Sequence, residues 1–335
     1  MNDSSQKLTD QWGRQMDYLR IAVTDRCNLR CFYCMPEEGI NFLPKKELLT
    51  YEELLRLSII FCDLGVKKIR ITGGEPFVRK DLITFLGDLK QTPGLEKLHL
   101  TTNGVLTSKY IAEMVNLGID GINLSLDSLE PQNFFKITRR NEFTTVENCL
   151  RDLVGSSIPL KINVVVMRGL NDHEIIPMAK LAQHDNLHVR FIEEMPFNGS
   201  TESNQELVSH KEIRKVLESE FGELQQTSKT ESSDPASLFQ IKGFIGKIGI
   251  IPAYTRTFCG SCNRIRLTAT GTIKNCLYDE GVFDLKGFLR SGVSDSEVKS
   301  ALLKVADKKE KNGMLTESNR LKNKNIQESM SEIGG

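Results

Sequence analysis

Six of the eight cysteines form two groups of three, with the spacings CxxxCxxC and CxxC followed by one more cysteine after thirteen residues: Cys27, Cys31 and Cys34, then Cys259, Cys262 and Cys276. Thiolates bind zinc or iron–sulfur clusters, and structural zinc usually takes four ligands where each group here offers three. An iron–sulfur cube held by three thiolates keeps one iron open for a substrate or a cofactor. At the first group the spacing therefore favours an iron–sulfur cluster, with zinc as the alternative. At the second group zinc is a stronger alternative, because CxxC is a common zinc half-site.

Two glycines and a carboxylate follow a β-rich segment in KKIRITGGEP, at Gly73, Gly74 and Glu75. Paired glycines allow the backbone to approach a ligand closely, and an adjacent carboxylate can receive an ammonium group. A glycine pair alone is a weak signal. Together with the first cysteine group, it indicates a ligand site.

Basic residues alternate with apolar ones in several β-rich segments. Arg264 and Arg266 follow the second cysteine pair two positions apart, which on a strand places both on one face. The others in this pattern are Arg20, Lys68, Arg70, Lys161 and Arg190. Such charges are costly in a buried sheet unless they meet opposite charge, and arginine binds phosphate through paired donors. Together these basic residues suit the binding of a triphosphate, although each residue by itself is equally consistent with a surface salt bridge.

Six β-rich segments precede residue 196 and must position these groups: 19–24, 67–72, 97–102, 121–127, 160–167 and 188–195. Helical patterns separate most of them; the clearest helix begins at Thr50 with Glu53 at capping-box spacing and ends near Gly65. Strands that alternate with helices predict a parallel sheet. With six units, the fold class predicted is α/β, an incomplete (β/α)6 TIM-type barrel, in which ligands lie at the carboxyl ends of the strands. The first cysteine group follows the first of these segments.

A second region begins near residue 200. A helix is expected around 209–222 between two serine-rich loops, and a β-hairpin around 238–253, before the second cysteine group. Cys62 and Cys149 lie alone inside predicted helices and are expected to be buried as small hydrophobes.

Composition excludes some classes of function. Lysine plus arginine equals aspartate plus glutamate, 44 each, so a generally basic surface for nucleic acid is not expected. No run of about 18 apolar residues predicts a membrane span, and the polar start predicts no secretory signal. We expect a cytoplasmic protein, with reduced thiols and no contact with nucleic acid or membrane.

The sequence strings at these sites resemble a known family. CxxxCxxC with Tyr33 before its last cysteine, followed by GGEP, is similar to the radical S-adenosylmethionine superfamily. The strings DRCNLRCFYCMP, LTTNG, SLD, RFIEEMP and CGSCNRIRL, with the terminal GG, resemble more closely the family of the GTP 3′,8-cyclases (molybdenum cofactor biosynthesis protein A). The similarity runs from about residue 18 to the carboxyl terminus.

The resemblance implies two [4Fe-4S] clusters and S-adenosylmethionine as cofactors. Cys27, Cys31 and Cys34 would hold the first cluster, and Cys259, Cys262 and Cys276 the second. Residues at family positions that contact S-adenosylmethionine are Tyr33, Gly74, Ser125 and Met195, with core packing as the alternative for Met195. Those at GTP-binding positions are Arg20, Lys68, Arg70, Thr101, Lys161, Arg190, Arg264 and Arg266. The catalytic positions implied are Arg264, Arg266, Gly334 and Gly335, the glycines forming a tail that enters the active site.

The resemblance also implies an organisation and a reaction. Residues 1–230 would form the radical S-adenosylmethionine partial barrel, and residues 231–335 a domain with the second cluster, the GTP-binding arginines and the tail. The enzyme would be a lyase that converts GTP to (8S)-3′,8-cyclo-7,8-dihydroguanosine 5′-triphosphate, the first step of molybdenum cofactor biosynthesis. Its partners would be an external one-electron donor, the cyclic pyranopterin monophosphate synthase that receives the product, and a second copy in a homodimer.

Two other functions remain open from the residues. One is a radical S-adenosylmethionine enzyme with an auxiliary cluster that acts on a peptide or another substrate. The other is a zinc-stabilised binding module without catalysis. The loop after Met195 and the lysine-rich stretch before the tail depart from the family pattern, so no function is assigned to them.

Overall fold

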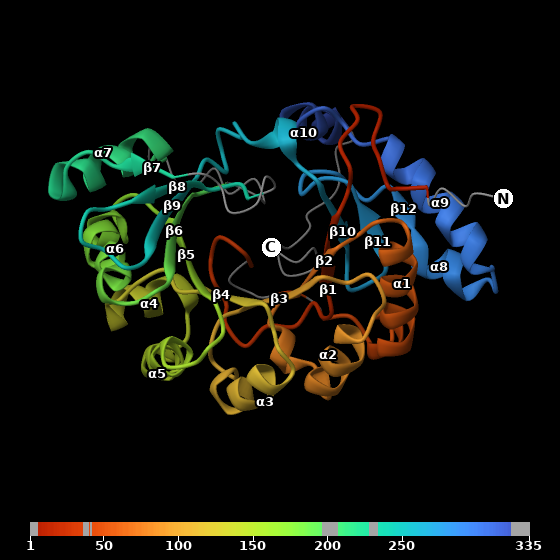
Figure 1. Cartoon of the computed structure of the whole chain (residues 1–335), viewed down its shortest axis with the longest axis horizontal. Helices are drawn as coiled ribbons and strands as arrows, with labels where there is room; N and C mark the ends of the chain where they lie inside the picture. The colour runs from red at the N-terminus through yellow and green to blue at the C-terminus, as the bar shows by residue number, and fades with distance from the viewer. Residues whose placement is uncertain (1–5, 36–39, 41, 196–206, 228–233, 323–335) are drawn as a thin grey trace. The chain divides into compact units, whose positions relative to one another are not determined.

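The computed structural model describes residues 6–35, 40, 42–195, 207–227 and 234–322 (Figure 1). Its contacts divide the chain into two compact units. The first unit comprises Met1–Asn28, Ile40–Leu100 and Cys259–Gly335, and the second Leu29–Gly39 and Thr101–Phe258. The chain thus returns to the first unit after completing the second. The boundary at residue 230 between functional domains stays a prediction.

The strands of the first unit follow the order β12-β11-β10-β1-β2-β3. Their bounds are Tyr18–Ala22 (β1), Lys68–Thr72 (β2), Lys97–Thr102 (β3, whose last two residues belong to the second unit), Arg264–Leu267 (β10), Thr272–Lys274 (β11) and Phe283–Asp284 (β12). β1 pairs in parallel with both β2 and β10, and β2 pairs in parallel with β3. β11 and β12 continue the sheet in antiparallel. A late strand, β10, thereby becomes the neighbour of the earliest one.

The strands of the second unit follow the order β4-β5-β6-β9-β8-β7. Their bounds are Gly121–Ser125 (β4), Leu160–Val166 (β5), His188–Glu193 (β6), Gln225–Gln226 (β7), Ser237–Gln240 (β8) and Lys247–Ile251 (β9). β4, β5, β6 and β9 run parallel, and β8 pairs antiparallel with β9. The predicted hairpin is therefore confirmed as β8–β9.

The predicted α/β fold is confirmed, since the six expected strands are β1 to β6 and those paired within each unit are parallel. The burial of each strand accounts for its pattern of residues. All five residues of β2 are buried, whereas β5 alternates between buried and half-buried residues and turns Lys161, Asn163 and Val165 to one face. The sequence did not predict that β9 and β10 would pair in parallel with β6 and β1.

Helix α1, Tyr51–Asp63, begins at the predicted capping box: Glu53 N–H donates to the Thr50 hydroxyl, and the Glu53 carboxylate accepts from Thr50 N–H. Leu54, Leu57 and Phe61 form its buried face. The predicted helix of the second region is α7, His210–Phe221. The other helices are Leu82–Lys90 (α2), Ile111–Asn116 (α3), Pro131–Thr138 (α4), Phe143–Val154 (α5), Ile175–His184 (α6), Leu285–Arg290 (α8), Asp295–Asp307 (α9) and Gly313–Lys322 (α10).

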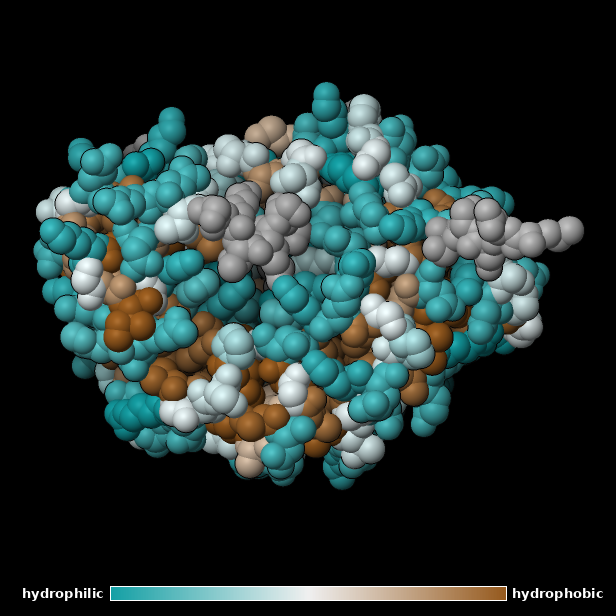
Figure 2. Space-filling view, in the orientation of Figure 1, coloured by the Kyte–Doolittle hydropathy of each residue, from teal (hydrophilic) through white to brown (hydrophobic). Residues whose placement is uncertain are grey.

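The surface shown in Figure 2 is mainly hydrophilic, with hydrophobic residues gathered in its lower half. Cys62 and Cys149 are buried inside α1 and α5, as predicted. Within the described residues, no helix combines the length and the apolar character needed to cross a membrane.

Candidate active site

Strand register in the first unit aligns three arginines across three strands. On β1, Arg20 lies opposite Arg266 of β10 on one side and Arg70 of β2 on the other. Laterally aligned residues of a parallel sheet point to the same face, so the guanidinium groups form one row. The neighbouring row contains Arg264, Tyr18 and Lys68. The predicted alternation of Arg264 and Arg266 on one face of a strand is confirmed in β10.

Tyr18 is the acid at the centre of these cations. Its hydroxyl accepts a hydrogen bond from Arg70 Nε at 2.6 Å, and Lys68 Nζ lies 5.0 Å from its ring centroid. Burial raises the pKa of Tyr18, but the charges of Arg70, Arg20, Lys68 and Arg264 outweigh burial and bring its pKa down to about 7. Tyr18 was not among the predicted site residues, although its position two residues before Arg20 places it on the same strand face.

Burial and like charge act together on the arginine row. Burial lowers the pKa of Arg20 well below its usual value, and the charges of Arg266, Arg70 and Arg264 lower it further. Burial likewise lowers the pKa of Arg266, with the charge of Arg264 adding to it. Mutual repulsion of buried cations is relieved by a bound polyanion, because an opposite charge favours the charged form. The row can therefore bind a phosphate chain.

The second cysteine group adjoins this row in the chain. Cys259 opens a 3-10 turn, Cys259–Ser261, and Cys262 N–H donates to Cys259 O at 3.2 Å just before β10. Cys276 follows β11, and its N–H donates to Asp279 Oδ2 at 2.8 Å. All three cysteines thus lie next to β10 or β11 in the chain, and β10 carries both Arg264 and Arg266.

The thiols of this group have unequal acidities. Burial raises the pKa of Cys262, yet the charges of Lys309 and Arg264, together with a hydrogen bond from Arg264 N–H, lower it to about 7. At Cys276 burial dominates and raises the pKa. A thiol that ionises near neutral pH is a ready metal ligand, since the thiolate is the form that binds.

The first cysteine group lies in one loop that crosses the division between the units. Cys27 belongs to the first unit, and Cys31 and Cys34 to the second. In the second unit, the N–H groups of Cys34 and Met35 both donate to Cys31 O at 2.9 Å, which closes a tight turn. Phe32 N–H donates to Ile137 O at 3.1 Å, so the turn is tied to the last residues of α4.

Tyr33 of this loop is fixed by a buried carboxylate. Its hydroxyl donates to Asp127 Oδ2 at 2.7 Å, while Asp127 Oδ1 accepts from Val165 N–H at 2.8 Å. Burial raises the pKa of Asp127 to about 6, and burial with the Asp127 charge raises that of Tyr33. Asp127 was missed as a site residue, although it is the last residue of the SLD string.

Gly73 and Gly74 pack against the chain that leads into Cys27. A Cβ on Gly74 would meet Arg26 O at 2.3 Å, and one on Gly73 would meet Thr24 O at 2.6 Å, with Gly73 at φ +153°. Gly74 N–H donates to Thr24 O and Glu75 N–H to Arg26 O, both at 2.8 Å. The glycines therefore give close backbone packing beside the first cysteine loop; contact with a ligand at Gly74 stays a prediction.

The cations of the second unit surround a carboxylate. Arg190 Nη2 donates to Asp234 Oδ2, and Lys161 Nζ lies 3.8 Å from the same oxygen. The side chains are 6% (Arg190), 5% (Asp234) and 18% (Lys161) exposed. Asp234 Oδ1 also accepts from Ala236 N–H at 3.0 Å. The sequence analysis did not identify Asp234, because nothing in its neighbourhood indicates which cation it meets.

The same face of the second unit carries polar atoms with no hydrogen-bond partner among the described residues: Asn123 Oδ1, Asn163 Oδ1 and His188 Nδ1. Register places Asn163 opposite Ser125 of β4 and opposite Arg190 of β6. Burial and the charges of Lys161 and Arg190 together lower the pKa of His188 to about 4, so the ring is neutral. Buried polar atoms of this kind indicate a ligand or water.

Two other predicted residues lie at strand ends. Thr101 is half-buried in β3. Met195, just beyond β6, packs against a hydrophobic cluster of Ala236, Leu238, Ile251 and Ala253. This packing is the alternative that the sequence left open for Met195, and its contact with S-adenosylmethionine stays a prediction. Gly334 and Gly335 lie outside the described residues.

Glu193 organises the end of β6 and was also missed. Its carboxylate accepts from the N–H groups of His210, Tyr254 and Thr255 at 2.7 to 3.0 Å, and His210 Nδ1 lies at 2.8 Å. Burial raises the pKa of Glu193, but these hydrogen bonds outweigh burial and lower it. Glu193 thus joins β6 to the start of α7 and to the loop after β9.

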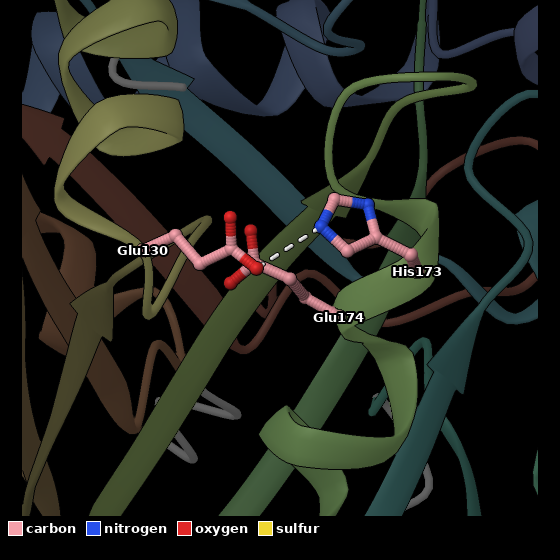
Figure 3. Close-up of side chains that lie close together, drawn as sticks. All are labelled: Glu130, His173 and Glu174. Atoms are coloured by element: carbon pink, nitrogen blue, oxygen red, sulfur yellow. Dashed lines mark hydrogen bonds and ion pairs between the residues drawn. The ribbon is translucent and has the colours of Figure 1, made fainter.

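A third polar cluster, Glu130, His173 and Glu174, has the spacing of metal ligands (Figure 3). Its buried carboxylate is already used: Glu174 accepts from Ser128 Oγ and Leu129 N–H, both at 2.6 Å, and from Asn133 Nδ2 at 3.2 Å. Glu130 and His173 are exposed and pair with each other at 3.2 Å. These contacts explain the cluster without a metal, as a structural link between the starts of α4 and α6.

The donor sets fit the implied cofactors. All eight cysteines are among the described residues and none is joined in a disulfide, so both groups can offer sulfur ligands. Ser125 and the open Asn163 Oδ1 share a face that can bind the polar groups of a nucleoside.

Two family models match the chain. Residues 21–182 match the Radical SAM superfamily and residues 187–315 match Molybdenum Cofactor Synthesis C. A GTP 3′,8-cyclase of Thermodesulfovibrio yellowstonii is 41% identical over 300 residues, 89% of this chain and 93% of that protein. Molybdenum cofactor biosynthesis protein 1 of Homo sapiens is 42% identical over 292 residues, 87% of this chain but 46% of that protein. The chain thus spans about half the length of that relative.

Among solved structures, Streptococcus suis SuiB bound to S-adenosylmethionine has a TM-score of 0.55 with 14% identity, covering 88% of this chain and 71% of that one. The complex of SuiB with its precursor peptide SuiA has a TM-score of 0.51, also with 14% identity. At this identity the likeness shows a shared fold.

Proposed function

Because the chain belongs to the family of the GTP 3′,8-cyclases, we propose that it converts GTP to (8S)-3′,8-cyclo-7,8-dihydroguanosine 5′-triphosphate. The reaction is the lyase step that opens molybdenum cofactor biosynthesis. Rearrangement of the released product belongs to the cyclic pyranopterin monophosphate synthase.

The observation that carries this proposal is the row of Arg266, Arg20 and Arg70 across β10, β1 and β2. Three arginines on one face, with Arg70 and Arg266 buried, suit the triphosphate of GTP, which their paired donors can bind. Arg266 lies four residues after Cys262, so a nucleotide bound by the row would have its base within reach of the second cysteine group. Lys68, Arg264 and Thr101, with Lys161 and Arg190 of the second unit, are the further GTP-binding residues proposed.

Cys27, Cys31 and Cys34 would hold the first [4Fe-4S] cluster, and Tyr33, Gly74, Ser125 and Met195 would contact S-adenosylmethionine. When bound, these cofactors would supply the radical chemistry that acts on the GTP ribose. Asp127 positions Tyr33 through the hydrogen bond at 2.7 Å. Cys259, Cys262 and Cys276 would hold the second cluster, at which the guanine is bound.

The protein contributes chiefly by position. The ribose C3′ and the guanine C8 belong to one molecule, and joining them requires both the phosphate end and the base end to be held. The arginine row would bind the phosphate end. Arg264 and Arg266, together with Gly334 and Gly335, are the catalytic residues proposed. A neutral Tyr18 favours triphosphate binding, since its phenolate would compete for Arg70.

The remaining partners follow from the chemistry. An external one-electron donor must reduce the first cluster. A cytoplasmic location suits clustered cysteines, because thiols stay reduced there. We also propose that two copies of the chain form a homodimer.

The test is anaerobic turnover of the reconstituted enzyme. We expect about eight irons per chain, with 5′-deoxyadenosine and a cyclised guanine nucleotide formed in equal amounts when GTP is supplied and neither with ATP. Equal release of 5′-deoxyadenosine with and without GTP would contradict the proposal and favour an enzyme that acts on another substrate, such as a peptide. A colourless zinc protein that forms neither product would overturn it altogether.

A further inference from the structure

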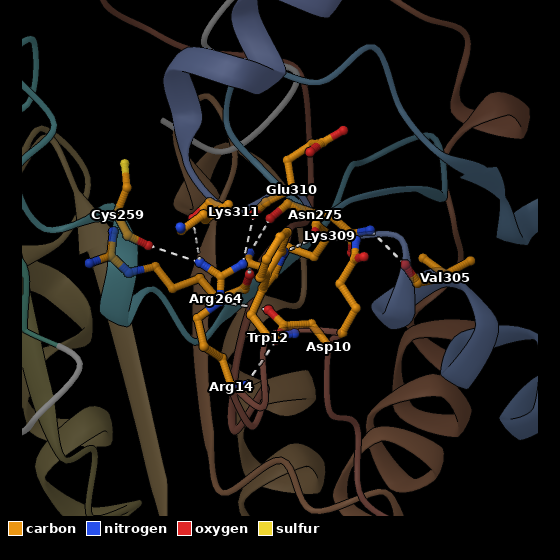
Figure 4. A network of polar contacts seen from close by, with 11 residues as sticks. Asp10, Trp12, Arg14, Cys259, Arg264, Asn275, Val305, Lys309, Glu310 and Lys311 are labelled. Atoms are coloured by element: carbon orange, nitrogen blue, oxygen red, sulfur yellow. Dashed lines mark hydrogen bonds and ion pairs between the residues drawn. The ribbon is translucent and has the colours of Figure 1, made fainter.

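Lys309, just beyond the end of α9, is a buried cation that the proposed function does not use. The residue is 3% exposed. Its Nζ donates to Arg264 O at 2.7 Å and to Asn275 O (Figure 4). Arg264 is two residues after Cys262, and Asn275 immediately precedes Cys276. The ammonium therefore lies between the two segments that carry these cysteines.

These contacts leave the charge of Lys309 uncompensated. Both acceptors are neutral carbonyls, and no carboxylate of the described residues lies within ion-pair distance of Nζ. Arg14, in the same network, shows the contrast: its Nε lies 2.6 Å from the buried carboxylate of Asp10. A buried ammonium without opposite charge costs several kcal/mol. A lysine buried in this way indicates that an anion completes the site.

The surrounding residues hold Lys309 in place. Trp12 Nε1 donates to Lys309 O at 3.1 Å, and Arg14 Nη2 donates to Glu310 O at 2.7 Å. Arg14 Nη1 donates both to Lys311 O at 2.9 Å and to Cys259 O at 3.0 Å. One guanidinium therefore joins the backbone after α9 to Cys259, the first cysteine of the group. The ammonium is fixed relative to all three cysteine-bearing segments.

We propose that Lys309 is the buried counter-charge of the second cysteine group, and that it stabilises the reduced form of the cluster held there. This inference rests on the proposed function, which assigns a cluster to Cys259, Cys262 and Cys276. Three thiolates bring negative charge to the site, and one-electron reduction adds more. A fixed positive charge between the cysteine-bearing segments opposes that accumulation, and it acts strongly because the site is buried. Lys309 is a positioning and tuning residue, since it touches backbone rather than substrate.

The experiment compares Lys309→Met with Lys308→Met in the full-length reconstituted enzyme. Lys308 is the exposed neighbour and offers the same change of side chain without burial. Midpoint potentials of both clusters are measured by redox titration followed by electron paramagnetic resonance, and the signal absent from a Cys276→Ser variant is assigned to the second site. We expect Lys309→Met to disfavour reduction of the second cluster at least tenfold, or about 59 mV for a one-electron couple. The first cluster and Lys308→Met should keep wild-type potentials.

Two further variants separate charge from structure. Lys309→Gln keeps a hydrogen-bond donor without the charge, and Lys309→Arg keeps the charge. If the neutral variants fail to retain the second cluster while Lys309→Arg retains it, the proposal is supported. Equal potentials in Lys309→Met and Lys308→Met would overturn it, as would loss of the cluster from all three Lys309 variants. A wild-type protein with only about four irons per chain would instead remove the second cluster itself, and with it the premise drawn from the proposed function.

Discussion

Two sets of cations are balanced by different acids. The first set lies on β10, β1 and β2, and the second on β5 and β6. In the first set, Arg70 donates to the phenol of Tyr18, whose pKa is brought down to about 7. In the second, Arg190 and Lys161 meet the carboxylate of Asp234. A phenol of this acidity can take up a proton near neutral pH and withdraw its negative charge, whereas Asp234 is held in ion pairs with both cations. The first set can therefore become fully positive for an incoming anion, while the second carries its own competing anion.

This difference predicts unequal contributions to GTP binding. The largest effect is expected from Arg266→Ala, which removes one end of the arginine row. Loss of a buried charge-assisted contact should weaken GTP binding about a thousandfold, or about 4 kcal/mol. Calorimetric titration of GTP into the anaerobic enzyme measures this change.

Iron content provides the control for Arg266→Ala, because the residue is not a predicted ligand and both clusters should assemble. Unchanged GTP affinity would remove Arg266 from the binding site.

The second effect concerns pH. The folded pKa of Tyr18 is about 7 against an ordinary value of 10.0, so its ionisation adds stability as pH rises from 7 towards 10, and that stability is lost as pH falls through 7. Wild type should gain up to about 1.4 kcal/mol per pH unit over Tyr18→Phe, or about 2.3 kcal/mol between pH 7, where the phenol is half ionised, and pH 9. Chemical denaturation of the apoprotein across this range measures the difference.

GTP should reverse that trend, because the phenolate competes with the triphosphate. Wild-type GTP affinity is expected to fall above pH 7 relative to Tyr18→Phe. Parallel pH profiles for the two proteins would show that Tyr18 does not ionise in this range.

The smallest effect is expected at Asp234. Asp234→Asn keeps the shape of the side chain but removes the anion that occupies Arg190 and Lys161, so GTP should bind about tenfold more tightly, or by about 1.4 kcal/mol. Asp152→Asn on the exposed surface of α5 is the matched control and should leave the affinity unchanged. Weaker binding in Asp234→Asn would mean that the carboxylate holds Arg190 in its binding geometry instead of competing with GTP.

Much of the local structure could be predicted from residue patterns. Thr50 and Glu53 predicted the start of α1 because a capping box is a contact between residues three apart. Alternation predicted that Arg264 and Arg266 share a face, since successive side chains of a strand point to opposite sides. The hairpin β8–β9 followed from two β-rich segments joined by a short glycine-containing link.

The partners of buried charges could not be predicted in the same way. Arg20 lies beside Arg266 only because β10 pairs in parallel with β1, across more than two hundred residues of chain. Asp234 and Lys309 meet their partners through contacts of the same kind. Residue spacing carries no information on such pairs, because register between distant strands is set by packing of the whole sheet.

The sequence by itself determined the chemistry that is available: two groups of three cysteines, the alternation of basic residues on strands, and membership of an enzyme family readable from short strings. Tertiary structure decided which charges meet, and so the acidity of Tyr18 and Cys262 and the position of Lys309 beside the second cysteine group. The reason is physical. Ligand type depends on the atoms that a side chain carries, whereas its charge state depends on burial and on neighbours that only folding brings close.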